Sequence, residues 1–175
     1  LGQALVADPR VALVSATGSS AMGRAVGVAV AQRFGKVLLE LGGNNAAVVA
    51  PSADLNLVVR ALVFAAVGTA GQRCTTLRRL LVHSSVRAQL LQRLVRAYEG
   101  VPIGNPLQSG VLVGPLIDEA AYQHMQQALQ EAQQQGGQVL TGGQRVAVPG
   151  CEGGCYVRPA IVAMPAQSAV VQRET

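Results

Sequence analysis

The chain has 175 residues, enough for one ordinary domain with a buried core; 50% of them are hydrophobic and only 13% are charged, which argues against global disorder. Its net charge of +5 comes almost entirely from scattered arginines with few aromatic neighbours, so a nucleic-acid groove is not indicated. No apolar run reaches the ~18 residues of a membrane span, and no signal peptide is visible. We therefore expect a cytoplasmic protein with neither nucleic acid nor membrane as a partner.

The first predicted unit is a buried strand at Val11–Ser15, followed by a glycine-containing turn and a helix that runs to about Phe34. Ser19 or Ser20 can cap this helix. A strand, a turn and a helix N-terminus together form a ready anion site, because the backbone N–H groups and the helix dipole point at the incoming charge. The glycines Gly18 and Gly23 are spaced G-x4-G rather than G-x-G-x-x-G, so phosphate binding and a plain turn both remain open.

A second strand is predicted at Lys36–Leu41, and it carries Glu40 to the edge of a sheet just before a glycine pair. By itself Glu40 could be an ordinary strand-end carboxylate. A further strand at Ala46–Ala50 precedes a helix that Pro51 opens and Ser52 caps. The apolar residues of that helix recur at helical spacing and indicate one broad buried face: Leu55, Val58, Val59, Leu62, Val63, Ala66 and Val67.

One thiol, Cys74, follows that helix in the turn Gly71–Thr76. A buried inert thiol is the commonest fate of a free cysteine, but the flanking Gly, Gln, Arg and Thr argue against apolar burial here. A thiolate attacks a carbonyl, and the thioester that forms needs a base to activate water. Cys74 and Glu40 would supply both functions.

Alternating strands and helices continue to the end of the chain and predict an α/β protein with a mainly parallel sheet. The expected elements are two helices, one capped by Ser84 or Ser85 and running to about Glu99 and one over 119–135, and strands at 80–83, 139–140 and 156–162. His83 is interpreted as structural. Cys151 and Cys155 form a C-x3-C pair without a nearby histidine, so loop cysteines without a role are favoured over a metal site or a disulfide.

Two segments, Glu40–Ala46 (ELGGNNA) and Val67–Arg79 (VGTAGQRCTTLRR), resemble the paired active-site blocks of the NAD(P)-dependent aldehyde dehydrogenases. The residues of these segments are most similar to the antiquitin group, the α-aminoadipic semialdehyde dehydrogenases. Ala16 stands where most of the superfamily has Phe, and the antiquitin group resembles this sequence at that position too. The resemblance implies that residues 1–43 are the C-terminal part of a Rossmann-type NAD-binding domain and 44–175 most of the catalytic thiol domain. Because these enzymes are more than twice as long, we expect an internal piece, inactive alone, of a homo-oligomer (dimer or tetramer).

The resemblance further implies oxidation of an aldehyde, L-2-aminoadipate 6-semialdehyde, with Cys74 as nucleophile and Glu40 as the base that activates water. It assigns binding of the NAD cofactor to Thr17, Gly18, Ser19, Gly23, Glu40, Leu41 and Glu174. Arg73 and Thr75 would contact the substrate, and the Arg73 guanidinium can pair bidentately with a carboxylate. The alternatives are an arginine bound to a protein acid, an acylating or other semialdehyde dehydrogenase, and a non-catalytic piece that acts in assembly.

Overall fold

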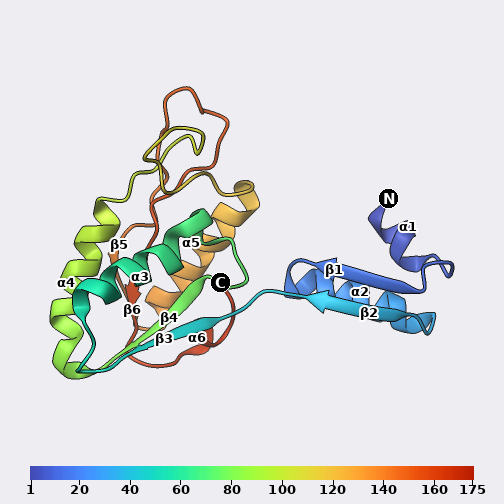
Figure 1. Cartoon of the computed structure of the whole chain (residues 1–175), viewed down its shortest axis with the longest axis horizontal. Helices are drawn as coiled ribbons and strands as arrows, with labels where there is room; N and C mark the ends of the chain where they lie inside the picture. Colours follow the sequence, from blue (N-terminus) through green and yellow to red (C-terminus); the bar gives the residue numbers. More distant parts are fainter. The chain divides into compact units, whose positions relative to one another are not determined.

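A computed structural model describes all residues from Leu1 to Thr175, and the chain divides between Gly43 and Asn44 into two compact units (Figure 1). The first unit is Leu1–Gly43 and the second is Asn44–Thr175. The assignment of these units to a coenzyme domain and a catalytic domain stays a prediction.

The first unit is a β-α-β arrangement, in which β1 (Leu13–Thr17) and β2 (Lys36–Glu40) pair in parallel. The helix α2 (Ser20–Gln32) connects them and buries Val30 completely. A short helix that the sequence did not predict, α1 (Gly2–Ala7), precedes β1, and the Arg33 guanidinium bonds to its Val6 carbonyl at 3.0 Å.

Both predicted strands and the predicted helix of this unit are confirmed as elements, with shifted ends. The predicted burial of the first strand is wrong: only Val14 of β1 is buried, because the two-stranded sheet has no further strand beside it within this unit. The strand begins at Leu13, and the helix ends at Gln32 rather than near Phe34, because Phe34 has a left-handed backbone with φ of 55°. Of the two candidate caps, Ser19 is the one used: its side chain accepts a hydrogen bond from the Met22 N–H at 3.1 Å.

The second unit begins with a second parallel pair, β3 (Asn45–Val49) and β4 (Leu77–Val82), joined through the helix α3 (Leu55–Val67) and a short 3-10 helix (Gly68–Gly71). The helix α4 (Ser84–Glu99) packs against α3. Their core is formed by residues from β3 and both helices: Val49, Leu62, Leu90 and Leu94. The predicted apolar face of α3 is confirmed, since none of its seven residues is exposed.

The two caps predicted for α3 and α4 are wrong. Ser52 lies in a turn closed by the Ala53 N–H and the Ala50 carbonyl, so the Asp54 carboxylate caps α3 instead, accepting from the Asn56 N–H at 2.8 Å. At α4 the ring of His83, rather than Ser84 or Ser85, accepts from a backbone N–H, that of Ser85, at 3.3 Å. This contact confirms the structural interpretation of His83.

The rest of the second unit contains α5 (Glu119–Gln134), β5 (Gln138–Thr141), β6 (Ile161–Ala163) and α6 (Ala169–Gln172). The predicted strand over 156–162 is mostly wrong, because Pro159 lacks the N–H that a strand interior needs and only Ile161–Ala163 forms a strand. β5 and β6 pair antiparallel, so two of the three sheets are parallel and the third is not.

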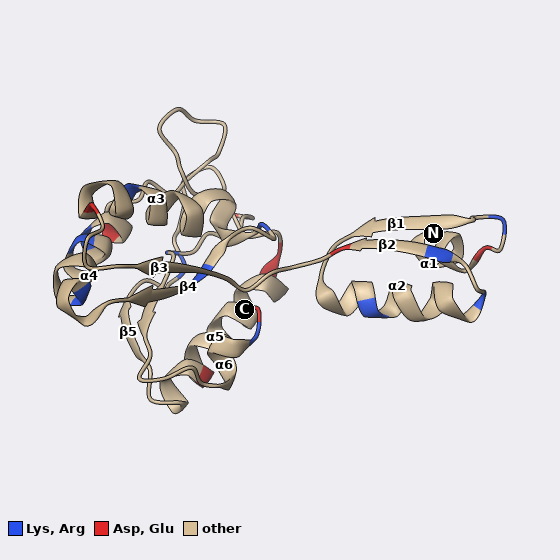
Figure 2. Cartoon of the chain, turned by 60° about the horizontal axis from the view of Figure 1, so that its bottom comes forward, with Lys and Arg blue, Asp and Glu red and all other residues tan.

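The arginines are spread over both units (Figure 2). α4 carries several of them, and the polar face of α5 is mostly glutamine. No helix in the chain combines the length and the hydropathy required to cross a membrane.

Candidate active site

The turn that the family resemblance assigns to cofactor binding lies at the carboxyl ends of β1 and β2. The Gly18 N–H donates to the Glu40 carbonyl at 3.0 Å, so the turn after β1 is fastened to the last residue of β2. Thr17, Gly18 and Ser19 are all exposed, and α2 begins directly after them. An exposed turn at the start of a 13-residue helix can accept an anion, because free N–H groups of the first helical turn point outward.

Gly23 and Leu41 contact each other beneath this turn. Gly23 is buried, and a Cβ placed on it would come within 2.4 Å of the Leu41 side chain. Gly23 therefore provides room for Leu41 to pack against α2. Glu40 is exposed at the end of β2 and forms no salt bridge, which leaves its carboxylate accessible to solvent.

Cys74 lies in the loop between the 3-10 helix and β4. It is exposed, as the polar residues on either side of it predicted. Three consecutive residues before it, Thr69, Ala70 and Gly71, have left-handed backbones with φ of 54°, 52° and 72°. A left-handed backbone costs a residue other than glycine about 1–2 kcal/mol. Such strain gathers at functional sites, where the surrounding structure holds it in place.

Gln72 holds this strained segment from the side, a role that the sequence did not reveal. Its side-chain amide donates to the Thr69 carbonyl at 3.2 Å and the Pro115 carbonyl at 3.3 Å, and its oxygen accepts from the Ile117 N–H at 2.8 Å. The loop at 114–117 is thus tied to the cysteine loop. The only signal in the sequence was the place of Gln72 two residues before Cys74.

Asn45 was also missed as a site residue, although it lies in a quoted motif. Its side-chain amide donates to the Cys74 carbonyl at 2.6 Å and to the Thr76 carbonyl at 3.1 Å. Because these partners are about thirty residues away, no local pattern could have assigned them.

Of the two residues predicted to contact the substrate, Arg73 is half-buried and folds against α3. Its guanidinium donates to the Phe64 carbonyl at 3.3 Å and lies 5.4 Å from the centre of the Phe64 ring. Its Nε is buried and has no hydrogen-bond partner, and no protein acid pairs with it. Thr75, the second predicted contact, is exposed beside Cys74. Arg73 therefore keeps a donor that a ligand could satisfy.

Glu174 is brought to β4, the strand that follows the cysteine loop. Its carboxylate lies 3.8 Å from the Arg78 guanidinium. Burial lowers the pKa of Arg78, and the Glu174 carboxylate acts in the opposite direction. The second unit thus brings Cys74 and Glu174 to the start of β4, while the other predicted cofactor residues lie at the ends of β1 and β2 in the first unit.

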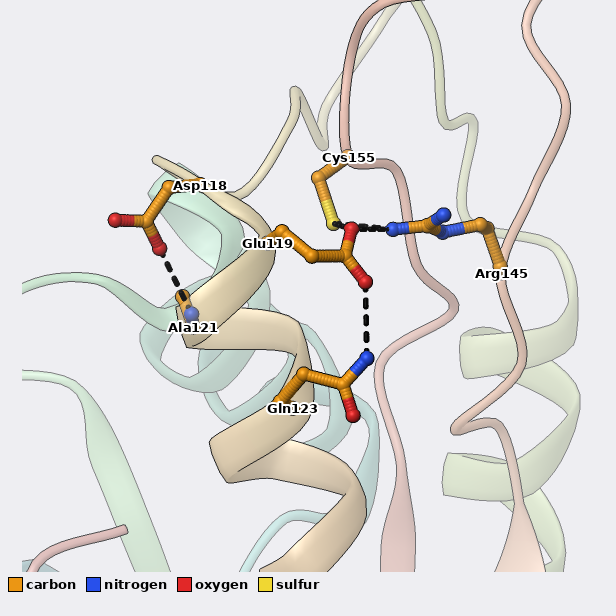
Figure 3. Close-up of polar contacts among 6 residues, drawn as sticks. All are labelled: Asp118, Glu119, Ala121, Gln123, Arg145 and Cys155. Carbon is orange, nitrogen blue, oxygen red and sulfur yellow. Dashed lines mark hydrogen bonds and ion pairs between the residues drawn. The ribbon is translucent and has the colours of Figure 1, made fainter.

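A further polar cluster accounts for Cys155 (Figure 3). Its sulfur lies 3.3 Å from the Arg145 guanidinium, which also pairs with the Glu119 carboxylate in the first turn of α5. Hydrogen bonds from Gln123 and, to a smaller extent, from Arg145 lower the pKa of Glu119. Cys151 and Cys155 are both free thiols, and the chain contains no group of three or more His, Cys, Asp and Glu side chains that could hold a metal ion.

Comparisons with known proteins match the whole chain. A family model described as "Aldehyde dehydrogenase family" matches residues 1–175. Aldehyde dehydrogenase family 7 member A1 of Pisum sativum is 50% identical over 99% of the chain, and alpha-aminoadipic semialdehyde dehydrogenase of Mus musculus is 47% identical over 100%. Betaine aldehyde dehydrogenase of Staphylococcus aureus, solved in complex with NAD+, superposes with a TM-score of 0.93 at 25% identity, over 99% of this chain and 35% of that one. The predicted α/β fold is confirmed, and the chain spans about a third of the relatives' length (34% and 32%).

Proposed function

The chain belongs to the aldehyde dehydrogenase family, and from this membership we propose that it is the nucleophile-bearing part of an enzyme that oxidises an aldehyde to a carboxylate with a nicotinamide cofactor. The observation that carries the proposal is Cys74, an exposed thiol in a strained loop whose backbone is held by neighbouring side chains. The proposed substrate is L-2-aminoadipate 6-semialdehyde, in agreement with the name of the mouse relative. A homo-oligomeric state and a cytoplasmic location stay predictions.

In the proposed first half-reaction, the Cys74 thiolate attacks the aldehyde carbon and forms a carbon–sulfur bond. The negative charge that develops on the carbonyl oxygen is held by the Cys74 backbone N–H. A side-chain amide from a segment outside this chain, expected from the family resemblance, would supply a second donor. The aldehyde carbon then loses a hydride and becomes a thioester on Cys74. NAD, when bound, supplies the hydride acceptor.

The second half-reaction needs a base, and Glu40 is proposed for it. Its carboxylate takes a proton from water as the water attacks the thioester, and the acid and the free Cys74 thiol are the products. The exposure of Glu40 and its freedom from salt bridges support this role. An acylating dehydrogenase, which transfers the acyl group to another acceptor, does not need such a carboxylate.

The residues at the ends of β1 and β2 fit a dinucleotide. The exposed Thr17–Ser19 turn and the free N–H groups at the start of α2 suit the diphosphate, and Gly23 keeps Leu41 packed beneath them. Glu174 is proposed to accept hydrogen bonds from a ribose of the cofactor, with Arg78 orienting its carboxylate.

Arg73 and Thr75 are proposed to contact the substrate beside Cys74. The buried Arg73 Nε that lacks a partner supports this, because an unsatisfied buried donor is unfavourable until a ligand accepts its hydrogen bond. A guanidinium at this place favours a semialdehyde whose far end carries a carboxylate.

The test is aldehyde oxidation by the full-length protein and its Cys74→Ala variant. The parent should form NADH with aminoadipic semialdehyde, and the variant should retain less than about a thousandth of that rate because the covalent step is lost. Cys151→Ala, which removes a thiol outside the proposed site, is the matched control and should stay active. Substantial NADH formation by Cys74→Ala would refute the proposal.

A further inference from the structure

Two consecutive asparagines, Asn44 and Asn45, lie where β3 begins, and each contacts segments that are distant in the sequence. The Asn45 side chain has two N–H donors, and its two bonds go to the carbonyls of Cys74 and Thr76. The β3–β4 pairing is irregular between Asn45 and Ala46. An irregularity of this kind re-aims a side chain, here toward the cysteine loop.

The other side of the cysteine loop is closed by Thr76, which is only 1% exposed. The Arg73 N–H donates to the Thr76 hydroxyl at 3.1 Å, and the Thr76 N–H donates to the Arg73 carbonyl at 3.0 Å. Cys74 therefore lies in a turn that Arg73 and Thr76 close by bonding to each other. The carbonyls of Cys74 and Thr76 in this turn bond to the Asn45 side chain. If those two carbonyl groups could move, the backbone N–H and the thiol of Cys74 would move with them.

Asn44 makes the corresponding connection to the end of the chain. Its side-chain amide donates to the Val171 carbonyl at 2.9 Å. Its backbone carbonyl accepts two hydrogen bonds from the Arg79 guanidinium, at 2.8 and 3.1 Å. Val171 lies in α6, just before the segment that carries Glu174. Arg78, the neighbour of Arg79 on β4, pairs with Glu174 itself.

We propose that Asn45 and Asn44 are positioning residues. Asn45 fixes the loop that carries Cys74, and Asn44 fixes the segment that carries Glu174. These two neighbouring residues at the start of β3 thereby align the nucleophile with the carboxylate that is proposed to bind the cofactor. This inference rests on the proposed function. Neither asparagine contacts the reacting atoms; each acts through the backbone that it holds.

The two roles predict different kinetic effects in the full-length protein. Asn45→Ala should lower the rate of the NADH burst about ten- to a hundredfold, the loss expected when a reacting group is misplaced by about 1 Å, with the Kd for NAD unchanged. Asn44→Ala should raise the Kd for NAD at least about fivefold and slow the burst at saturating NAD by less than threefold, since it loosens only the Glu174 segment. If the asparagines served only the stability of the fold, each variant would change the burst rate and the Kd for NAD together.

Hydrogen exchange of the apoprotein gives a readout that needs no activity. Amides of 72–76 should exchange at least about fivefold faster in Asn45→Ala, and those of 170–175 in Asn44→Ala, with little change in the other segment. Asn56→Ala, which removes an asparagine that bonds to Arg93 on α4, is the matched control and should affect neither segment. Asn45→Ser keeps one donor and should fall between the parent and Asn45→Ala.

The outcomes separate the two levels of the proposal. Unchanged exchange in both variants, or faster exchange with an unchanged burst and an unchanged Kd for NAD, would overturn the positioning roles while leaving Cys74 as nucleophile. If Cys74→Ala remains active, the proposed function fails, and with it the kinetic arm, but the exchange data still show whether the asparagines hold the two segments. If Asn45→Ala does not fold, the comparison of Asn45→Ser with the parent decides the same question.

Discussion

Replacing Arg73 by alanine tests the proposed selectivity for a carboxylate-bearing semialdehyde. Within the chain the substitution removes one hydrogen bond to the Phe64 carbonyl and one contact with the Phe64 ring. Each is worth roughly 0.5–1 kcal/mol of folding free energy, and neither loss distinguishes one substrate from another. Loss of a buried, hydrogen-bonded charge pair with a substrate carboxylate would cost about 2–5 kcal/mol more, since the partner charge is left unpaired.

At about 1.4 kcal/mol per factor of ten, the second contribution corresponds to a loss of roughly thirtyfold or more. We expect kcat/KM for aminoadipic semialdehyde to fall by at least about this factor in Arg73→Ala, with a change below about threefold for an uncharged aliphatic aldehyde of similar length. Arg73→Lys should give an intermediate loss, because an ammonium keeps the charge but not the planar fork.

The assay is steady-state NADH formation with both aldehydes, supported by a thermal melt of each variant. Phe64→Leu is the matched control, since it removes the ring contact while leaving the guanidinium in place, and it should change both substrates little and equally. Equal losses on the two aldehydes in Arg73→Ala would refute the selectivity hypothesis and indicate that Arg73 serves the fold.

Three further predictions concern the base, a glycine and a partly buried phenol. Glu40→Gln should keep a burst of NADH while steady turnover becomes limited by deacylation, because no carboxylate activates water; stopped-flow traces without a burst but with intact NAD binding would contradict this role. Gly142→Ala should destabilise the protein by more than about 2 kcal/mol in urea unfolding, because Gly142 has φ of 80° and the new Cβ would lie 1.9 Å from the Pro159 carbonyl oxygen. Gly153→Ala is the control and should change the stability little, since no atom lies within 4 Å of its new Cβ. Burial raises the pKa of Tyr98 from 10.0 to about 12, so the folded state keeps the phenol protonated after the unfolded state has lost the proton. The resulting stability, about 2–3 kcal/mol, is fully present below pH 10 and lost as the pH rises toward 12, and Tyr98→Phe should flatten this part of the stability curve; an equally steep curve would contradict it.

The elements that the sequence predicted well are those set by a local repeat. The apolar spacing along α3 identified its buried face, and the Val–Ala runs identified β1 and β3, because burial of one face and the period of the backbone are properties of adjacent residues. Helix caps were less predictable. Several residues near each start could cap, and the choice of Asp54 over Ser52 depended on a turn that had already engaged the neighbouring backbone.

By itself, the sequence determined the α/β class, the family and the exposed state of Cys74, since motifs and polar flanking residues act within a few positions of the chain. The tertiary structure alone decided how Cys74 is held, because its supports come from Asn45, and those of the neighbouring Gln72 from the loop at 114–117. The same applies to the pair of Arg78 with Glu174 and to the antiparallel β5–β6 sheet. A hydrogen bond or a strand pairing between distant segments is selected by the packing of the whole unit, and no local period specifies which partner will be near.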